Sequence, residues 1–394
     1  MNKLRMGIIG IGNIGSTHLK NITGGLCPDI EVTAVADINP ARPEYAVEEV
    51  AKAGAKEITC FDTAEAMLDS GLIDGGIIDA VIIAVPHYDH PRFAMECFKR
   101  GLHVMVEKPA GVYTKQVREM NTAAEKAGVV FGMMFNQRTD HIYRKMKELV
   151  QSGELGQIRR TSWIVTNWYR PQAYYDSGAW RATWSGEGGG VLLNQCPHNL
   201  DLWQWICGMP SKVHAFCHYG KWRDIEVEDD VSVYVEYPNG ATGTFVTTTA
   251  DIPGTNRFEI TLEKGKLVSE NDKLYLWKLE QSEPDFSKSN IVPFAQPAFE
   301  YSEVETDGES TQHAGVLNAF AGAVLRGEPL IAGGEEGING LTISNAIHLS
   351  SWTNSTVELP FDEDLFYAKL MKRAAASRRK VDTKAVFADT SGTY

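Results

Sequence analysis

A six-residue glycine turn, GIGNIG at residues 10–15, constrains the fold of this chain more than any other feature. It follows an apolar run at Leu4–Ile9, which predicts a strand, and precedes a helical pattern at Ser16–Ile22. A second apolar run, Glu31–Ala36, is followed by Asp37, which lies 22 positions after Gly15, the last glycine of the turn. This spacing is typical of a βαβ unit that holds a dinucleotide pyrophosphate at a helix N-terminus. The residues expected to contact the dinucleotide here are Gly10, Gly12, Asn13, Ile14, Gly15 and Asp37.

Asp37 favours NAD over NADP as the cofactor. A carboxylate at this position accepts hydrogen bonds from the ribose hydroxyls and repels a 2′-phosphate. Arg42 is near enough in sequence to soften that repulsion, so NADP stays open as an alternative. The other interpretation of the turn is that it only packs a helix on a strand.

The pattern of strand and helix signals continues to about residue 137. Strands alternating with helices predict parallel crossover units and a doubly wound Rossmann sheet over residues 1–137. The further strands are expected at Glu57–Phe61, Ile78–Val85, His103–Val106 and Val129–Phe135, and the helices between them at Pro91–Arg100 and Thr114–Ala127.

Polar residues follow the fourth and fifth strands at the carboxyl edge, where open α/β sheets bind ligands. The residues expected to line the cofactor here are Pro86, His87, His90, Glu107 and Lys108, although the two histidines could equally be solvated. Glu107 and Lys108 end the fifth strand, and the proline that follows favours an extended backbone at Lys108. A lysine at this edge can be desolvated and can hydrogen-bond an oxygen that gains charge during hydride transfer.

Six segments occur in a characteristic order: GIIGIGNIG, AVIIAVPHYDH, HVMVEKPAG, FNQR, SGELGQIRR and GGGVLLNQCPHNLDL. Together, from Met6 to Glu358, they resemble the Gfo/Idh/MocA oxidoreductases. The resemblance implies a Rossmann domain followed by a domain built on a large open sheet, with the active site between them. It also implies activity on sugars and related polyols.

The pattern changes after residue 137, and successive strand signals favour an α+β domain with a large, mostly antiparallel sheet at 138–360. A polar extension, interpreted as a wrapping arm, is expected at 361–394. Because such sheets can pair face to face between subunits, a homodimer or homotetramer is expected. The clearest strands are Ile158–Asn167, Lys212–Tyr219, Val231–Tyr237 and Ala241–Thr249, and a helix is expected from about Glu335.

The segment GGGVLLNQCPHNLDLW, residues 188–203, reads as three glycines followed by an apolar helix, with Asn194 and His198 four residues apart on one face. The family's motif resembles GGGxLxDxGxHxxD. His198 therefore matches its histidine and Asp201 its second acid, whereas Asn194 replaces an aspartate. The resemblance implies that His198 takes the hydroxyl proton while Lys108 stabilises the substrate oxygen; Asp201 is not expected to be catalytic.

The amide at Asn194 leaves two assignments of the base open, because it can hydrogen-bond but cannot take up a proton. His198 can be the base with neutral support, or Lys108 can take the proton if its pKa is lowered. His198 is preferred since its ordinary pKa suits the task. The alternative for His198 and Asn194 is a pair of core residues with satisfied hydrogen bonds.

Aromatic residues interleaved with arginines between residues 163 and 184 suit a saccharide, whose C–H faces stack on rings, although each ring could equally pack against the sheet. The sixth strand ends in polar residues at the carboxyl edge, of which Arg138 could instead brace the domain junction. Besides Asn194 and His198, the expected substrate contacts are Asn136, Gln137, Arg138, Trp168, Tyr169, Trp180 and Arg181.

Charge and cysteine content exclude several other classes. The net charge of −13 and the lack of a basic stripe argue against nucleic acid as a partner. No apolar run reaches the ~18 residues of a membrane span. Six cysteines without CxxC spacing indicate reduced thiols and a cytoplasmic protein. His214 and His218 share one face of a strand but lack further ligands, so no metal is expected.

The leading hypothesis is an NAD(P)-dependent oxidoreductase acting on a secondary hydroxyl or ketone of a sugar, anhydrosugar, cyclitol or glycoside. A second hypothesis is a glycosidase or lyase that recycles its NAD through a transient 3-keto sugar. A third is a sugar or nucleotide sensor without turnover, against which the presence of both Lys108 and His198 argues.

Overall fold

The computed structural model describes residues 3–70, 76–378, 380 and 383. The first third of the chain forms a six-strand sheet in the order β3-β2-β1-β4-β5-β6, with parallel pairing throughout. This order reverses beside β1 and defines the doubly wound Rossmann sheet that the sequence predicts. The strands are β1 (Leu4–Ile9), β2 (Ile30–Ala36), β3 (Thr59–Phe61), β4 (Ala80–Ile83), β5 (His103–Val106) and β6 (Phe131–Met133).

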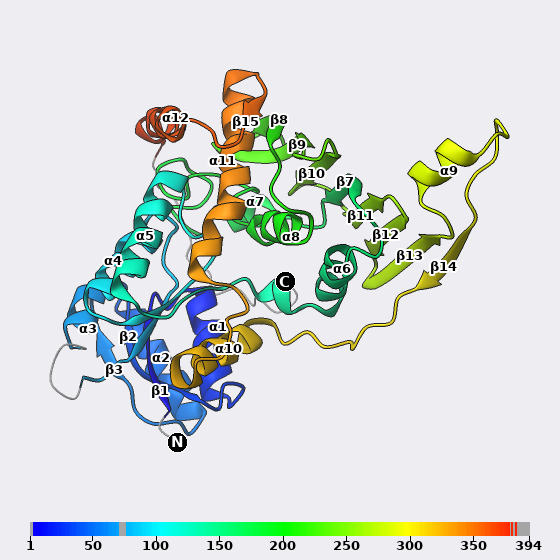
Figure 1. The fold of residues 1–394 in the computed structure, drawn as a ribbon. Coiled ribbons are helices and arrows are strands. Elements are labelled where there is room, and N and C mark those ends of the chain that lie inside the picture. The colour runs from blue at the N-terminus through cyan, green and yellow to red at the C-terminus, as the bar shows by residue number, and fades with distance from the viewer. Residues whose placement is uncertain (1–2, 71–75, 379, 381–382, 384–394) are drawn as a thin grey trace.

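Helices cover both faces of this sheet (Figure 1). One apolar cluster joins α1 and α2 to the sheet, and a second joins α3, α4 and α5 to its other face. Because both faces are covered, a central strand such as β4 is apolar and buried along its whole length. The helices are α1 (Asn13–Thr23), α2 (Ala41–Lys52), α3 (Ala64–Ser70), α4 (Asp89–Lys99) and α5 (Thr114–Ala127).

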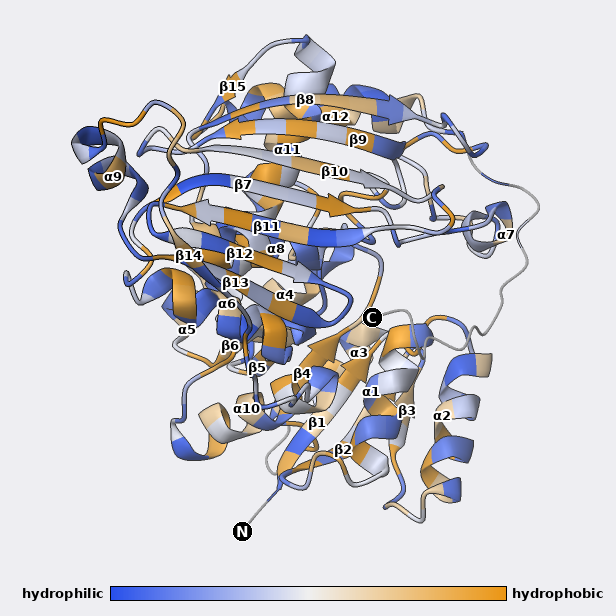
Figure 2. Cartoon of the chain, turned by 90° about the vertical axis from the view of Figure 1, so that its right-hand side faces the viewer, coloured by the Kyte–Doolittle hydropathy of each residue, from blue (hydrophilic) through white to orange (hydrophobic). Residues whose placement is uncertain are grey.

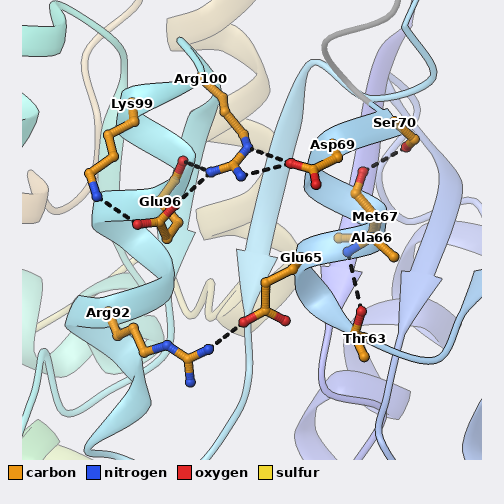
Figure 3. Close-up of polar contacts among 10 residues, drawn as sticks. All are labelled: Thr63, Glu65, Ala66, Met67, Asp69, Ser70, Arg92, Glu96, Lys99 and Arg100. Atoms are coloured by element: carbon orange, nitrogen blue, oxygen red, sulfur yellow. Dashed lines mark hydrogen bonds and ion pairs between the residues drawn. The ribbon is translucent and has the colours of Figure 1, made fainter.

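Ion pairs on the surface join α3 to α4 (Figure 3). Arg100, which directly follows α4, donates to Asp69 of α3 at 2.7 Å and to Glu96 of α4 at 2.7 Å. Arg92 of α4 pairs with Glu65 of α3. Exposed pairs of this kind contribute about 0–1 kcal/mol each. They orient the two helices, whereas the apolar cluster beneath them supplies most of the stability.

The second sheet has nine strands in the order β14-β13-β12-β11-β7-β10-β9-β8-β15. β7 and β10 pair in parallel, and the other pairs that the structure describes are antiparallel. The prediction of a large, mostly antiparallel sheet is confirmed. The strands are β7 (Ile158–Val165), β8 (Lys212–Tyr219), β9 (Glu228–Glu236), β10 (Thr242–Thr248), β11 (Asn256–Leu262), β12 (Gly265–Glu270), β13 (Lys273–Leu279), β14 (Phe299–Glu303) and β15 (Val357–Glu358).

One face of this sheet packs against helices, and Trp203 of α8 stacks on Phe245 of β10 with ring centroids 5.4 Å apart. The opposite face, seen in Figure 2, leaves Phe216, Tyr234 and Ile164 exposed. None of the helices in the described ranges is long and apolar enough to cross a membrane. The remaining elements up to this point of the chain are η1 (Asn136–Thr139), α6 (His141–Gln151), α7 (Gln172–Tyr175), α8 (Pro197–Cys207) and α9 (Glu283–Ser289).

The chain returns to the Rossmann sheet after the second sheet is complete. α10 (Gln312–Arg326) buries Val316 and Phe320 in the apolar cluster that contains β1 and α1, although it lies within the predicted range 138–360. After η2 (Gly334–Glu336), α11 (Gly337–Thr353) runs across the junction (Figure 1) and packs on α5, α8 and β8.

The C-terminal extension begins with a packed helix rather than a polar arm. α12 (Glu363–Ala375) buries Phe366 and Leu370, and Phe366 stacks on Trp352 with centroids 5.3 Å apart. Most of the predicted extension beyond residue 378 lies outside the described residues.

The prediction of one helix after the glycines of 188–203 is wrong in its first half. Residues 191–195 form turns, and α8 begins only at Pro197. A proline inside a continuous helix removes a hydrogen bond and clashes with the preceding turn, whereas at the first helical position neither cost arises. Asn194 therefore lies before the helix and His198 within its first turn, so they do not share a helix face.

Candidate active site

The glycine turn between β1 and α1 has the shape of a dinucleotide cradle. Gly10 has a positive φ of 91°, and a side chain at Gly15 would collide with the Gly10 carbonyl oxygen. A Cβ at Gly12, in contrast, would meet nothing within 4 Å, which leaves the N-terminus of α1 open to a pyrophosphate. Asp37 accepts the Ile11 N–H at 2.8 Å, so its carboxylate is held beside the turn.

Two histidines follow β4, and their surroundings differ. His90 is buried, and its ring nitrogens lie 2.7 Å from the carbonyl oxygens of Pro109 and Val85. Both nitrogens thus face backbone oxygens, and the ring N–H donates to one of them. This environment favours a structural role for His90, in which it holds the segment around Lys108, rather than the predicted contact with the cofactor. His87 is also buried; its Nδ1 lies 3.2 Å from the Glu187 carbonyl oxygen, and its ring meets Trp180 edge-on.

Glu107 supports the backbone at the end of β5. One carboxylate oxygen lies 2.7 Å from Nε2 of His18, and the other accepts the Lys108 N–H at 3.1 Å. Burial alone would raise the pKa of Glu107, but the His18 hydrogen bond and the positive groups nearby hold it below its usual value. A buried negative charge therefore lies within hydrogen-bond distance of the Lys108 backbone.

Lys108 reaches from the Rossmann sheet to the segment before α8. Its Nζ donates to the Asn194 carbonyl oxygen at 3.0 Å. Burial lowers the pKa of Lys108; Glu107 opposes this shift, and Arg170 and Arg181 add to it. A lysine in these surroundings can hold a substrate oxygen, and its lowered pKa lets it release a proton more readily than a lysine in water.

His198 lies in the first turn of α8 and is 2% exposed. Within the described part of the chain, neither of its ring nitrogens has a hydrogen-bond partner. Burial lowers the pKa of His198 well below its ordinary value, and the charge of Lys108 and that of His313 lower it further. The ring is therefore neutral at pH 7, and a buried imidazole with unpartnered nitrogens is suited to bind a hydroxyl.

Asn194 faces a carboxylate that the sequence reasoning missed. Its Nδ2 donates to Glu187, and its Oδ1 accepts from the Tyr174 hydroxyl at 3.3 Å. Tyr174 in turn accepts from Arg181 at 3.0 Å and from Gln195 at 3.2 Å. We refer to Lys108, Tyr174, Glu187, Asn194 and His198 as the polar cluster.

The other aromatic candidates border this cluster. Trp168 donates from its indole nitrogen to Asn199 at 3.0 Å, and Trp180 lies under the Arg181 guanidinium with 4.6 Å between carbon and ring centroid. Tyr169 is 39% exposed and is covered by Arg223. Trp168 and Trp180 are thus close to the polar cluster, and Tyr169 lies at the surface.

The residues that follow β6 brace the junction between domains. Arg138 is 2% exposed; it donates to both oxygens of Asp201 at 2.7 Å and to Glu336 at 2.7 Å. The two carboxylates balance the charge of Arg138. This arrangement favours the alternative given above, in which Arg138 braces the domain junction instead of contacting substrate. Asn136 is buried and donates to Gln312 at 2.6 Å, and Gln137 is partly exposed.

Among the described residues, no group of three or more histidine, cysteine or acidic side chains is placed to hold a metal ion. His214 instead lies 3.1 Å from the Thr356 hydroxyl. All six cysteines are free thiols.

The glycine turn before α1 is shaped to hold a dinucleotide, and Lys108 and His198 are buried near the carboxyl edge of the Rossmann sheet. These features are typical of NAD-dependent oxidoreductases. Family comparisons agree: residues 4–135 match the oxidoreductase family with an NAD-binding Rossmann fold, and residues 143–268 match the GFO/IDH/MocA C-terminal domain. The chain belongs to the Gfo/Idh/MocA oxidoreductase family, and its N-terminal domain is an NAD-binding Rossmann domain.

Relatives along the whole chain are distant. The chain is 25% identical to the myo-inositol 2-dehydrogenase of Thermotoga maritima over 90% of its own length and 98% of the relative's. It is 23% identical to the inositol 2-dehydrogenase of Rhizobium meliloti, over 87% and 95% of the two chains.

Solved structures share the architecture. The WlbA dehydrogenase of Bordetella pertussis, determined with NADH and UDP-GlcNAcA, aligns with a TM-score of 0.76 at 27% identity, covering 92% of this chain and 99% of the other. A levoglucosan dehydrogenase in complex with NADH and levoglucosan aligns with a TM-score of 0.73 at 21% identity, over 91% and 100%, and supports the fold alone.

Proposed function

We propose that this protein transfers a hydride between NAD and a secondary hydroxyl carbon of a sugar, anhydrosugar, cyclitol or glycoside. The observation that carries the proposal is the convergence of Lys108, from the end of β5, with His198, from the start of α8. Lys108 contacts the backbone four residues before His198, and its charge influences the pKa of that histidine. This contact supports a shared site for the two side chains at the junction of the two domains.

The residues around the glycine turn fit the cofactor. Gly12 and the N-terminus of α1 would hold the pyrophosphate, and Asp37 would accept the ribose hydroxyls, which favours NAD over NADP. His87 follows β4 at the carboxyl edge of the sheet; burial lowers its pKa, and the nearby His90 and Lys108 lower it further. When bound, the nicotinamide supplies the hydride acceptor or donor, a chemistry that no protein side chain provides.

The side chains handle the proton and the oxygen. In the direction of oxidation, the C–H bond of the alcohol gives up its hydride, and the O–H proton passes to His198, which is neutral because burial disfavours its charged form. Lys108 donates a hydrogen bond to the oxygen as negative charge develops there. Asn194 offers its Oδ1 as an acceptor that can orient a neighbouring hydroxyl.

The substrate class rests on the relatives and on the border of the polar cluster. Relatives named for inositol oxidation and a structure holding a nucleotide sugar indicate hydroxyl-rich rings. Trp168 and Trp180 offer aromatic faces, and Arg181 offers hydrogen bonds, so ring C–H faces and hydroxyls would both find partners.

The test is to incubate the purified protein with NAD and a panel of inositols, aldoses, anhydrosugars and aryl glycosides. Reduced cofactor and released sugar are followed together. Net reduction of NAD with one member of the panel is the expected result. Sugar release without net reduction would instead identify an NAD-recycling glycosidase. Tight binding of NAD without turnover of any compound would favour a sensor and contradict the proposal.

We also propose that two copies of this chain pair through the exposed face of the nine-strand sheet, giving a homodimer or a tetramer built from it. Phe216 of β8 and Tyr234 of β9 lie exposed on neighbouring strands, and Ile164 lies exposed on β7, which β10 separates from β9. Light scattering on the eluting protein should report a dimer or tetramer, and Tyr234→Lys should shift the mass toward the monomer. A wild-type mass of one chain would contradict this assignment.

A further inference from the structure

Glu187 is a buried carboxylate in the polar cluster, on a segment without helix or strand. It is 2% exposed, and both carboxylate oxygens are occupied. Oε2 accepts the Ala182 N–H at 2.5 Å, and Oε1 accepts the Asn194 amide. Burying a carboxylate costs free energy because its charge loses contact with water, so a buried carboxylate needs hydrogen bonds or opposite charges that compensate this loss.

Charged and titratable groups from several elements face Glu187. Burial raises its pKa, and the strongest opposing influence is the Arg181 guanidinium. Lys108 and Lys380 add positive charge from β5 and the C-terminal segment. The remaining groups that influence or contact Glu187 are Glu228 of β9, Tyr174 and Tyr175 of α7, and His87.

The contact between Glu187 and Asn194 determines which way the amide points. A carboxylate can only accept, so Asn194 must present Nδ2 to Glu187 and Oδ1 to the Tyr174 hydroxyl. The Asn194 carbonyl oxygen meanwhile holds the Lys108 ammonium. Glu187 is therefore linked to Lys108 both through the charge between them and through the residue that each contacts.

We propose that Glu187 is a positioning residue for hydride transfer: it orients the Asn194 amide and adds a second negative charge, besides that of Glu107, beside the Lys108 ammonium. The family's motif carries a carboxylate at position 194, where this chain has an amide. Here the carboxylate is Glu187, which accepts a hydrogen bond from the Asn194 amide. This inference rests on the proposed oxidoreductase function.

The test exchanges the charge and the amide between the two positions. Glu187→Gln removes the charge, so the pKa of Lys108 falls and the alkaline limb of the pH profile of kcat moves about one pH unit lower. At pH values above the alkaline limb, turnover should fall about tenfold, as a displacement of about one pH unit requires. In the double variant Glu187→Gln/Asn194→Asp, the new amide donates to the new carboxylate, and both the rate and the alkaline limb should return toward wild type.

Glu263→Gln is the matched control. Glu263 also accepts a backbone N–H, from Gln157 at 3.0 Å, but it lies at the opposite end of β7 from Trp168. It should leave rate and profile unchanged. A loop-anchoring role for Glu187 alone would lower thermal stability without moving the alkaline limb, and the double variant would recover no activity. Either of those two results overturns the proposal.

A readout without turnover separates this inference from the proposed function. Lysine labelled with ¹³C at Cε reports the Lys108 titration in the full chain, with its signal assigned by its loss in Lys108→Arg. The titration should move to lower pH in Glu187→Gln and return in the double variant. If Glu187→Gln does not fold, the double variant decides: a wild-type titration supports the proposal, and a displaced one overturns it. If no substrate is found for the wild type, the oxidoreductase proposal fails while this titration still reports on Glu187.

Discussion

The glycine turn and the polar cluster are both built to receive a ligand, but they are held in different ways. The turn of residues 10–15 joins two regular elements, and its shape follows from three glycines and the adjacent Asp37. The polar cluster draws on residues 86 positions apart, as in the bond from Lys108 to Asn194, and on turns between α7 and α8. Local sequence suffices for the first, whereas the second depends on tertiary contacts.

The difference is also chemical. The turn offers backbone N–H groups, which carry a fixed partial charge and suit any pyrophosphate. The polar cluster offers ionisable side chains with pKa values shifted by burial and by one another. Damage to the turn should therefore weaken binding, and damage to the cluster should slow the reaction.

The largest expected effect is on turnover when Lys108 is removed. Lys108→Ala loses the hydrogen-bond donor for the developing oxyanion, so kcat should fall by about 10³-fold. The dissociation constant of NADH, measured by fluorescence, should change less than about threefold. Lys99→Ala, which removes an exposed lysine from α4, is the control and should leave both values unchanged. Turnover within a few-fold of wild type would take Lys108 out of the mechanism.

Two buried histidines provide a sharper contrast. His198→Met removes a ring without hydrogen-bond partners in the described chain, so kcat should fall about 10²-fold while the free energy of unfolding changes by under about 1 kcal/mol. His90→Met removes the ring N–H that donates to the Val85 or the Pro109 carbonyl oxygen and should cost about 1–3 kcal/mol of stability. Urea unfolding and steady-state kinetics on both variants test whether His198→Met lowers mainly turnover and His90→Met mainly stability. The same response from both variants would contradict this expectation.

The pH profile of the wild type follows from the His198 pKa. Because burial lowers this pKa below 6.5 and the base must be neutral, the acidic limb of kcat/KM should lie below pH 6.5. That limb should disappear in His198→Met. An acidic limb above pH 6.5, or one that persists in the variant, would assign the proton to another group.

Glycine substitutions separate ligand binding from folding within the turn. Gly12→Ala places its Cβ in open space, so stability should hold while NADH affinity falls about tenfold. Gly15→Ala drives its Cβ into the Gly10 carbonyl oxygen and should destabilise the domain by about 2 kcal/mol or more. Equal affinity for NADH in Gly12→Ala and wild type would place the pyrophosphate elsewhere.

The smallest effect is on the choice of cofactor. Asp37→Ala removes the acceptor for the ribose hydroxyls and the repulsion of a 2′-phosphate, so the preference for NAD over NADP should shrink by about five- to tenfold. The ratio of kcat/KM values for the two cofactors measures this. An unchanged ratio would mean that another residue reads the ribose.

Sequence patterns predicted the Rossmann half well because its signals are local. The runs before and after the glycine turn became β1, α1 and β2 with small differences in their bounds, since buried parallel strands are continuously apolar. The second sheet was predicted as mostly antiparallel because strand signals follow one another along the chain. In the structure, β9 shows alternating burial along most of its length.

The polar cluster was only half visible from the sequence. Lys108 and His198 carry recognisable local motifs, but the partners of Asn194 do not. Glu187 precedes the glycine triplet as an ordinary acidic residue, and its burial against Asn194 depends on how residues 182–196 turn back on themselves. An acid beside an otherwise apolar glycine-rich run was the one available signal, and Tyr174 had none beyond its aromatic character.

The central claim is that Lys108 and His198 act on one substrate carbon. A crystal structure with NADH and a compound that the panel identifies tests it most directly. The account predicts the reacting carbon about 3–3.5 Å from the hydride-bearing carbon of the nicotinamide, with its oxygen hydrogen-bonded to both Lys108 Nζ and a His198 ring nitrogen. A substrate oxygen that touches neither side chain would contradict it.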